Sequence, residues 1–466
     1  MKKVLKRLLV LILLFAMTGG GFYAYTQFYD VTVTPDLRAA LTAATATPPA
    51  PAATPTATSA VTPVAAVPAS PPPTPADDAQ ALLHGNGYIA LMGVNAPANV
   101  ENTYAWALAL VEADMKPLQP GQTASAWDTA PGKITVQGDY KPALCMLSKG
   151  WEPFVINGPC TTTIQQLNQW ISGNTLLLTR YHSRFEYSRF IDVPGSGASG
   201  EFIREQQLFL AYLVSVSHAH PEGALQEWLK NAIFLKKALA DQTTLMSRSV
   251  LMVMYQQTQK VLPTLLAADP SLAAKYQPQL ADILAPFGPR EMNIVANTKA
   301  EERALAPVIT KLTPGGQAKF KQFWQDEITL AQTQTTHISE ASDAFHAKYA
   351  NPKLPATITK ETVTNTPPQD LAKALGEDAY VNLILAGIAE GADLFKAMEA
   401  LDARNRILNL YVQMKVQTIT PDKVGAFIQA AALHDPFTDK PFAYDAAKHL
   451  IYFSPVPGTV QGLLYN

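Results

Sequence analysis

The sequence predicts a mainly α-helical protein: a multi-helix periplasmic body that follows one transmembrane helix and a disordered linker and ends in a small C-terminal β-hairpin. Three observations predict this class. An uncharged apolar run at residues 8–29 follows a basic start, a proline-rich stretch comes next, and apolar residues then recur at helical spacing over residues 202–266. The expected division is a cytoplasmic basic tail (1–7), a transmembrane anchor (8–29), a linker (30–80), an irregular and helical part (81–198), a helical core (199–350), a loop (351–369), and C-terminal helices with the hairpin (370–466).

The run at residues 8–29 is long enough, as a helix, to cross a hydrocarbon core of about 30 Å. Lys2, Lys3, Lys6 and Arg7 precede it, and basic residues favour the cytoplasmic side. We therefore expect a single-pass inner-membrane protein with its C-terminal body in the periplasm. A cleaved signal peptide is the alternative, although the usual Ala-x-Ala cleavage pattern is absent.

The linker at residues 30–80 contains ten prolines between Pro48 and Pro75, among Ala, Thr, Ser and Val. This composition offers too little hydrophobic bulk and too few backbone N–H donors to fold. It predicts a disordered, extended segment. That segment is either a spacer that carries the body away from the membrane or a linker of unselected length.

The charge balance of the sequence limits which classes of partner the body can bind. The whole chain has 36 basic and 38 acidic residues, and four of the basic residues lie before residue 8. The remaining excess of acidic residues argues against nucleic acid, whose binding requires neutralisation of phosphates. The two cysteines of the chain, Cys145 and Cys160, flank a segment rich in Gly and Pro. In an exported protein such a pair favours a disulfide.

The helices of the body follow from apolar spacing and from N-terminal residues. Thr161 to Thr163 can cap a helix that begins near residue 164, and Pro221 suits a first helical turn. Residues 202–216 are apolar almost all round, which indicates a buried central helix. We expect helices at 101–112, 164–171, 202–216, 221–239, 243–266, 269–284, 298–312, 317–349, 369–399, 400–416 and 421–433, and a β-hairpin at 442–454.

One strip of the sequence has the residues of a binding site. It comprises Arg180, Tyr181, Arg184, Phe185 and Arg189. On a helix the first two arginines share one face and the two aromatic residues share the adjacent one. Such a strip can hold an anionic ligand or an acidic partner by bidentate hydrogen bonds and stacking. The alternative is a helix with its aromatic residues inward and its arginines in solvent.

Other motifs give little support for catalysis. Residues 195–200 match G-x-G-x-x-G, but no βαβ alternation follows, which favours a flexible loop before a helix. His218 and His220 have no third ligand nearby, so we expect no metal site there. Glu201 and Glu205 lie one turn apart and are expected to be surface and capping charges. The sequence predicts no cofactor and no catalytic residue.

Residues 435–444 (DPFTDKPFAY) resemble a run in the C-terminal region of type II secretion major pseudopilins, where it enters a calcium-binding β-loop. This chain lacks the Gly/Asp-rich continuation and the pilin processing signal, so the resemblance favours a rigid turn into the hairpin. As a whole the chain resembles N-terminally anchored helical envelope proteins of Gram-negative bacteria. The basic and apolar start, residues 228–239 and 245–254, and the Asp435-Pro436-Phe437 tail carry that resemblance. It implies an envelope location and no activity.

These observations predict a membrane-tethered periplasmic protein of the cell envelope that binds or scaffolds and does not catalyse. The expected partners are the inner membrane, through residues 8–29, and an envelope protein or the cell wall, with no nucleic acid. Two alternatives are a periplasmic cell-wall or glycan hydrolase and a protein that binds a small apolar ligand. The hydrolase requires a deep cleft that pairs a carboxyl group with a second polar catalytic group. The ligand-binding protein requires an enclosed apolar cavity.

Overall fold

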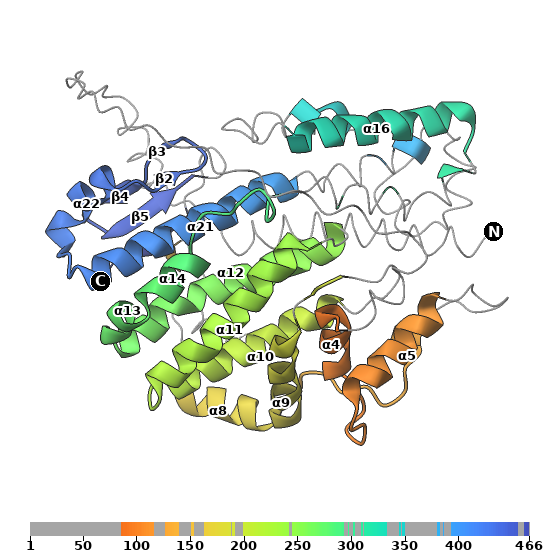
Figure 1. Ribbon diagram of the computed structural model, residues 1–466, viewed down its shortest axis with the longest axis horizontal. Helices are drawn as coiled ribbons and strands as arrows, with labels where there is room; N and C mark the ends of the chain where they lie inside the picture. The colour runs from red at the N-terminus through yellow and green to blue at the C-terminus, as the bar shows by residue number, and fades with distance from the viewer. Residues whose placement is uncertain are drawn as a thin grey trace, which may run out of the picture.

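The structure is a computed structural model. It describes residues 85–115, 126–138, 151–152, 163–187, 189–191, 199–241, 245–292, 297, 302, 309–310, 312–332, 344–345, 347–349, 380–382, 385, 393–454 and 461–465. Figure 1 shows the arrangement of these parts, with the helices layered beside one another and the strands gathered at one end. The protein is mainly helical and has a small C-terminal antiparallel sheet, which confirms the fold class at this level.

Three consecutive helices form the centre of the fold. They are α10 (Ser199–Ser217), α11 (Pro221–Ala240) and α12 (Leu245–Ala268), and each contacts the other two. Pro221 occupies the first turn of α11, where its missing N–H costs nothing and its fixed φ suits the helix. The prediction of a buried helix near residues 202–216 is confirmed, because most side chains of α10 are buried.

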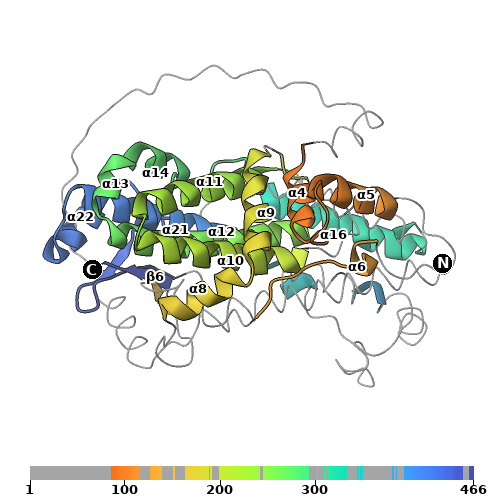
Figure 2. The ribbon, with the colours of Figure 1, turned by 90° about the horizontal axis from the view of Figure 1, so that it is seen from below.

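A layer of shorter helices covers α10. α8 (Ile164–Ser172) begins at Thr163, whose side chain accepts from the backbone N–H of Gln166 in a capping box. α9 (Thr175–Ser183) packs beside α8, and α4 (Gly87–Val94) packs against α9. α5 (Thr103–Met115) packs against α4, and α6 (Ala126–Thr129) against α5 (Figure 2). A Cβ atom built on Gly93 of α4 would lie 2.7 Å from the carbonyl oxygen of Thr103, so this glycine permits the close approach of α4 and α5.

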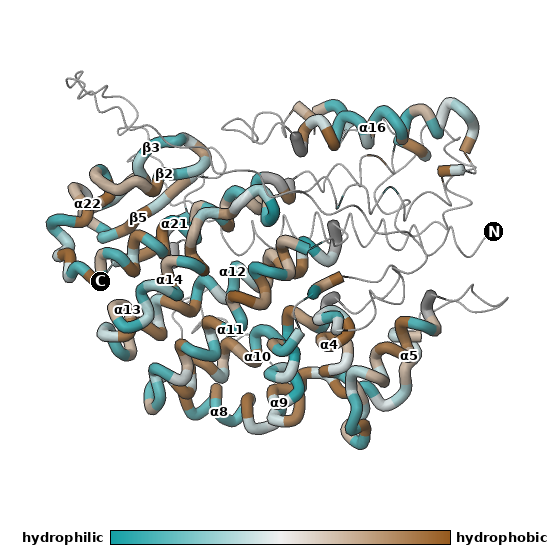
Figure 3. Tube along the Cα trace, in the orientation of Figure 1, coloured by the Kyte–Doolittle hydropathy of each residue, from teal (hydrophilic) through white to brown (hydrophobic). Residues whose placement is uncertain are grey.

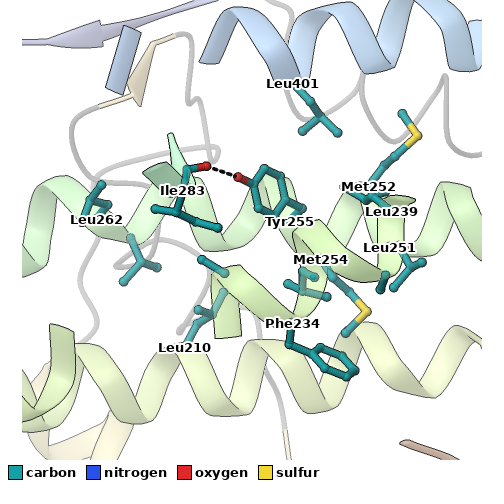
Figure 4. Close-up of a cluster of buried hydrophobic side chains, with 14 of the residues drawn as sticks. Leu210, Phe234, Leu239, Leu251, Met252, Met254, Tyr255, Leu262, Ile283 and Leu401 are labelled. Carbon is teal, nitrogen blue, oxygen red and sulfur yellow. Dashed lines mark hydrogen bonds between the residues drawn. The ribbon is translucent and has the colours of Figure 1, made fainter. Parts of the chain in front are cut away.

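A long helix, α21 (Asp393–Val416), runs along the other side of α12. It also contacts α13 (Ser271–Lys275) and α14 (Gln277–Ile283). Apolar side chains from α11, α12, α14 and α21 meet between these helices, among them Leu239, Ile283 and Leu401 (Figure 4). The Tyr255 hydroxyl lies within this cluster, 3.4 Å from the carbonyl oxygen of Ile283. The core of the body therefore lies between the central helices and α21.

Strands close the C-terminal end of the fold. β4 (Ala443–Asp445) and β5 (Leu450–Phe453) form the predicted hairpin, and β6 (Gln461–Leu464) pairs with β5. The sheet order is β1-β6-β5-β4, because β1 (Trp151–Glu152) joins from far earlier in the chain. β2 (His434–Asp435) and β3 (Lys440–Pro441) make a second, two-stranded ladder. α22 (Val424–Ala430) precedes the strands, and α16 (Pro314–Gln332) lies at the opposite end of α21 in Figure 1.

The predicted membrane anchor and inner-membrane location are corrected by the structure. Within the described part of the chain, no helix is both long enough and apolar enough to span a bilayer. The long central helices mix hydrophobic and hydrophilic residues along their length (Figure 3). Polar side chains such as Gln206 and Arg248 are buried in them. Residues 8–29, where the anchor was predicted, lie outside the described residues.

The predicted disulfide is corrected as well, since the described residues contain none. Cys145 and Cys160 lie outside them. The linker at residues 30–80 and the loop at residues 351–369 also lie outside the described part of the chain.

Candidate functional site

The most concentrated polar chemistry inside the helical body surrounds Arg184. α9 ends at Ser183, and the 3-10 turn η1 (Arg184–Glu186) then turns the Arg184 side chain inward, where the residue is 0% exposed. Its guanidinium donates to the carbonyl oxygen of Tyr181 at 2.7 Å and to Oδ1 of Asn231. Oε1 of Gln206 is a third acceptor at 3.4 Å. The buried cation thus has acceptors on three helices: Tyr181 on α9, Gln206 on α10 and Asn231 on α11.

A chain of hydrogen bonds extends this contact to α12. Both Gln206 Nε2 and Asn231 Nδ2 donate to the hydroxyl of Thr258, at 2.7 and 2.8 Å. That hydroxyl donates to the carbonyl oxygen of Met254 at 2.9 Å, and Trp228 Nε1 donates to the carbonyl oxygen of Thr258 at 2.8 Å. The side chains of Arg184, Gln206, Asn231 and Thr258, together with the Tyr181 hydroxyl that donates to Gln206, are called the Arg184 network below. It joins four helices through groups that are nearly all satisfied internally.

Aromatic rings enclose the guanidinium. It lies 3.1 Å from the ring centre of Tyr181 and 4.3 Å from that of Phe185, with Phe234 at 5.2 Å and Phe209 at 5.5 Å. The faces of these rings attract the cation, and the attraction is stronger without water. Burial nevertheless lowers the pKa of Arg184 to about 9, and the same burial raises the pKa of Tyr181.

A buried carboxyl group lies next to this network. Glu205 precedes Gln206 on α10, is 1% exposed, and neither of its carboxyl oxygens has a hydrogen-bond partner. Burial raises its pKa well above the usual value; nearby Glu201 adds to this, while the Asn95 side chain and Arg184 act in the opposite direction. Burial at this position therefore favours the protonated form of Glu205 over the carboxylate, because an ionised carboxylate is costly in the protein interior.

The predicted binding strip is distributed over several environments. Arg180 turns away from Arg184 and donates to the carbonyl oxygens of Ala96, Pro97 and Val100, so its guanidinium binds the segment that follows α4. Tyr181, Arg184 and Phe185 do come together, around the Arg184 network. Arg189 alone is exposed. The arginines at 180 and 184 do not share a solvent-facing helix face, because the α-helix ends between them and the next turn is a tighter 3-10 turn.

A second carboxyl cluster lies where α21 meets the strands. Asp402 accepts from the backbone N–H of Phe287 at 2.6 Å and from Arg406 at 2.8 Å. Asp435 accepts from the N–H of Phe437 and the hydroxyl of Thr438, at 3.0 and 3.2 Å. Glu399 completes the cluster; burial, with Asp435 and Asp402 adding to it, raises its pKa to about 8. Its Oε2 atom is buried and has no hydrogen-bond partner.

The remaining sequence motifs have local roles or lie elsewhere. His220 precedes the first residue of α11, and the part of the chain that the structure describes holds no group of three or more His, Cys, Asp or Glu suited to a metal ion. Residues 195–198 of the glycine-rich match lie outside the described residues, and residues 199 and 200 begin α10. Asp435 forms the predicted turn, with its carbonyl oxygen accepting from the N–H of Asp439 at 2.8 Å.

Sequence reasoning missed the buried polar residues of α10 and α12. Glu205, Gln206 and Gln207 are consecutive and all buried, directly before the apolar residues 208–214 of the same helix. Residues 256–260 (QQTQK) give α12 a similar buried polar run. Polar residues interrupting an all-round apolar helix were the available signal, since a helix without a solvent face must satisfy them inside.

The hydrogen bonds of the Arg184 network connect four helices of the body to one another. Beside the network, burial favours the protonated form of Glu205. Comparison of the chain with models of known protein families, with curated proteins and with solved structures finds no match in any of the three.

Proposed function

We propose that this protein is a non-catalytic binding or scaffolding module, in which a rigid helical body presents a surface to a partner. The Arg184 network is the observation that carries the proposal. Its guanidinium is bound by α9, α10 and α11 and connected to α12, so the strongest donor of the site serves internal cohesion. A body braced in this way keeps its surface preorganised, which reduces the entropy lost on binding.

The surface that we propose for the partner is centred on Arg189. This residue and Arg290 are both exposed, and both act electrostatically on the half-buried carboxyl of Asp241. Asp241 is itself held in place, because its Oδ2 accepts from the backbone N–H of Phe190 at 2.6 Å. Two exposed guanidinium groups that act electrostatically on one fixed carboxyl group form a surface suited to an acidic protein partner, since arginine binds carboxylates in a planar, bidentate manner.

The glycan hydrolase has weaker support from the same structure. Glu399 has the raised pKa that a general acid needs, and Asp402 and Asp435 are nearby carboxyl groups. All three residues are more than nine-tenths buried, and the oxygens of Asp402 and Asp435 already accept hydrogen bonds from the protein. These carboxyl groups stabilise the fold, and their burial keeps them from contact with a polysaccharide.

The proposal is tested by site-specific photo-crosslinking in the full chain at native expression. A crosslinker at position 189 should capture one reproducible protein. In the double variant Arg189→Glu with Arg290→Glu, position 189 is occupied by the substitution, so the crosslinker is placed at the exposed position 176. Capture of that protein should then be lost. The matched control is Lys237→Glu with Lys321→Glu, which reverses two exposed charges on α11 and α16. Equal capture by both double variants, or no capture at all, would count against this surface.

The partner's chemistry is then checked with purified components. Binding to the identified protein should weaken as salt is raised from 50 to 500 mM, because exposed charge contacts are screened. Acid-to-amide substitutions on the partner should reproduce the loss. Salt-independent binding would contradict an acidic partner.

A further inference from the structure

The second carboxyl cluster joins α21 to two other parts of the fold. On one side, Asp402 fixes the segment after α14 through the N–H of Phe287. On the other, Arg406 Nη1 donates to the carbonyl oxygen of His434 at 3.0 Å and so holds strand β2. The strands β2 to β6 are called the C-terminal β unit here; they reach α21 through this contact and through β5 and β6. The cluster is therefore a docking point for that unit.

The charges at this docking point do not balance when every carboxyl is ionised. Three carboxyl groups face one guanidinium, and Arg406 is already bonded to Asp402 through both Nε and Nη2 at 2.8 Å. Asp402 and Asp435 each have hydrogen-bond donors. Glu399 is 7% exposed and its Oε2 has no donor. It is consequently the carboxyl on which a proton is most stabilising.

We propose that Glu399 is a proton-operated latch: the C-terminal β unit docks firmly on α21 while this carboxyl is protonated and is loosened when it ionises beside Asp402 and Asp435. The cluster spans two chain segments, since Glu399 belongs to α21 and Asp435, which acts on it electrostatically, belongs to β2. Repulsion between them acts directly on the interface. The geometry thus couples one proton to the position of a whole structural unit.

The other charged groups around the cluster are few. On α21 they are Asp402 and Arg406, and on β2 they are Asp435 and the half-exposed His434, whose Nδ1 lies 3.8 Å from Asp439. On α11, Lys236 acts on Asp402 while donating to the carbonyl oxygens of Ile283 and Ala285. Asp435, Asp402 and Arg406 are the groups that act on Glu399, and the two carboxyls favour its protonated form.

The direction of the pH effect follows from linkage. The docked state raises the pKa of Glu399 to about 8, whereas an undocked, solvated carboxyl titrates near its usual value of about 4.5. The docked state therefore holds a proton that the undocked state lacks between these values. Docking is strongest below about pH 4.5, weakens as the pH rises to about 8, and levels off above that.

Hydrogen exchange of the full-length protein between pH 5 and 9, corrected for intrinsic exchange rates, tests the latch. Protection of amides in β4 and β5 should fall at least tenfold from pH 5 to pH 8, since one coupled proton allows up to about tenfold per pH unit. Glu399→Gln, which is neutral at every pH, should abolish this loss. Glu186→Gln, at an exposed glutamate, should behave as the wild type does.

Two results would overturn the latch. One is a flat profile for β4 and β5 in the wild-type protein, a measurement that depends on no variant. The other is the same pH slope in Glu399→Gln as in the wild type. Should Glu399→Gln fold poorly, Glu399→Met supplies a second neutral side chain of similar length, for which the same flat profile is expected.

Discussion

The Tyr255 hydroxyl on α12 lies 3.1 Å from Oδ1 of Asn405 on α21, and both side chains are buried between the two helices. Oδ1 of Asn405 also accepts from Gln259 Nε2 at 2.7 Å, and that same nitrogen lies 3.0 Å from the carbonyl oxygen of Leu401. These are the polar contacts that set the register between the central helices and α21. Apolar packing alone would tolerate small slides of one helix past the other, whereas hydrogen bonds of fixed length do not.

Replacing Tyr255 with Phe should lower the free energy of unfolding by about 1 kcal/mol, because one buried hydrogen bond is lost while the ring remains. Urea denaturation monitored by circular dichroism measures the change. Tyr212→Phe is the matched control, since Tyr212 is partly buried and its hydroxyl has no hydrogen bond to a described residue. Equal effects of the two substitutions would show that the contact with Asn405 contributes nothing.

Replacing Arg184 with Met should be much more damaging. The substitution removes the cation from its aromatic surroundings and leaves the acceptors of Tyr181 and Asn231 buried without a donor, each at a cost of about 1–3 kcal/mol. The expected loss of unfolding free energy is about 3 kcal/mol. Arg189→Met, at an exposed position, should change it by less than about 0.5 kcal/mol. A neutral outcome for Arg184→Met would mean that the helices pack equally well without the network.

Glu205 predicts a pH dependence of stability. Its pKa in the folded protein is raised well above 4.5 by burial, so the folded state keeps a proton that the unfolded chain releases as the pH rises above about 4.5. Stability therefore falls with increasing pH until the folded-state pKa is passed. Glu205→Gln should match the wild type near pH 4 and exceed it in midpoint temperature at pH 8. Parallel curves for the two proteins over that range would contradict a raised pKa of Glu205 in the folded protein.

Two glycines should respond to alanine in opposite directions. Gly93→Ala places a methyl group 2.7 Å from the carbonyl oxygen of Thr103, so α4 and α5 must separate, at a cost of about 1–3 kcal/mol. Gly223 lies on the exposed side of α11, where a new Cβ meets nothing nearer than 4.0 Å. Gly223→Ala should stabilise the protein by about 0.5–1 kcal/mol through helix propensity. Thermal unfolding of both variants measures the two signs.

Much of the helical fold could be predicted because apolar residues recur at helical spacing along the buried face of a helix. The helices from residue 199 to 268 lie close to their expected positions, and the capping residue Thr163 precedes α8 as expected. The break expected between residues 399 and 400 is absent, since α21 passes through it without interruption. α4 was not predicted: its eight residues are too few to establish a period, and its burial comes from neighbours remote in sequence.

The candidate site was harder to predict than the fold. The sequence indicates Arg180 and Arg184 as candidates for binding an anionic ligand or partner. Their acceptors in the structure are backbone carbonyls and amide side chains, which no local pattern reveals. Glu205 was assigned to the surface because its neighbours in sequence, Glu201 and Arg204, are charged. Whether a helix is buried on one face or all round depends on tertiary packing. A single sequence does not show this packing directly.

The pairing of β1 with β6 has a consequence for the order in which the chain can fold. Trp151 is paired with Leu463, and more than half of the chain lies between them. During synthesis the residues of β1 leave the ribosome long before their partners exist, so the first strand of this sheet must wait unpaired while α10, α11 and α12 assemble from local contacts. The C-terminal sheet therefore forms late, only after translation has passed residue 463. Until then β1 is an unpaired strand, and unpaired strands are prone to aggregation and are bound by chaperones.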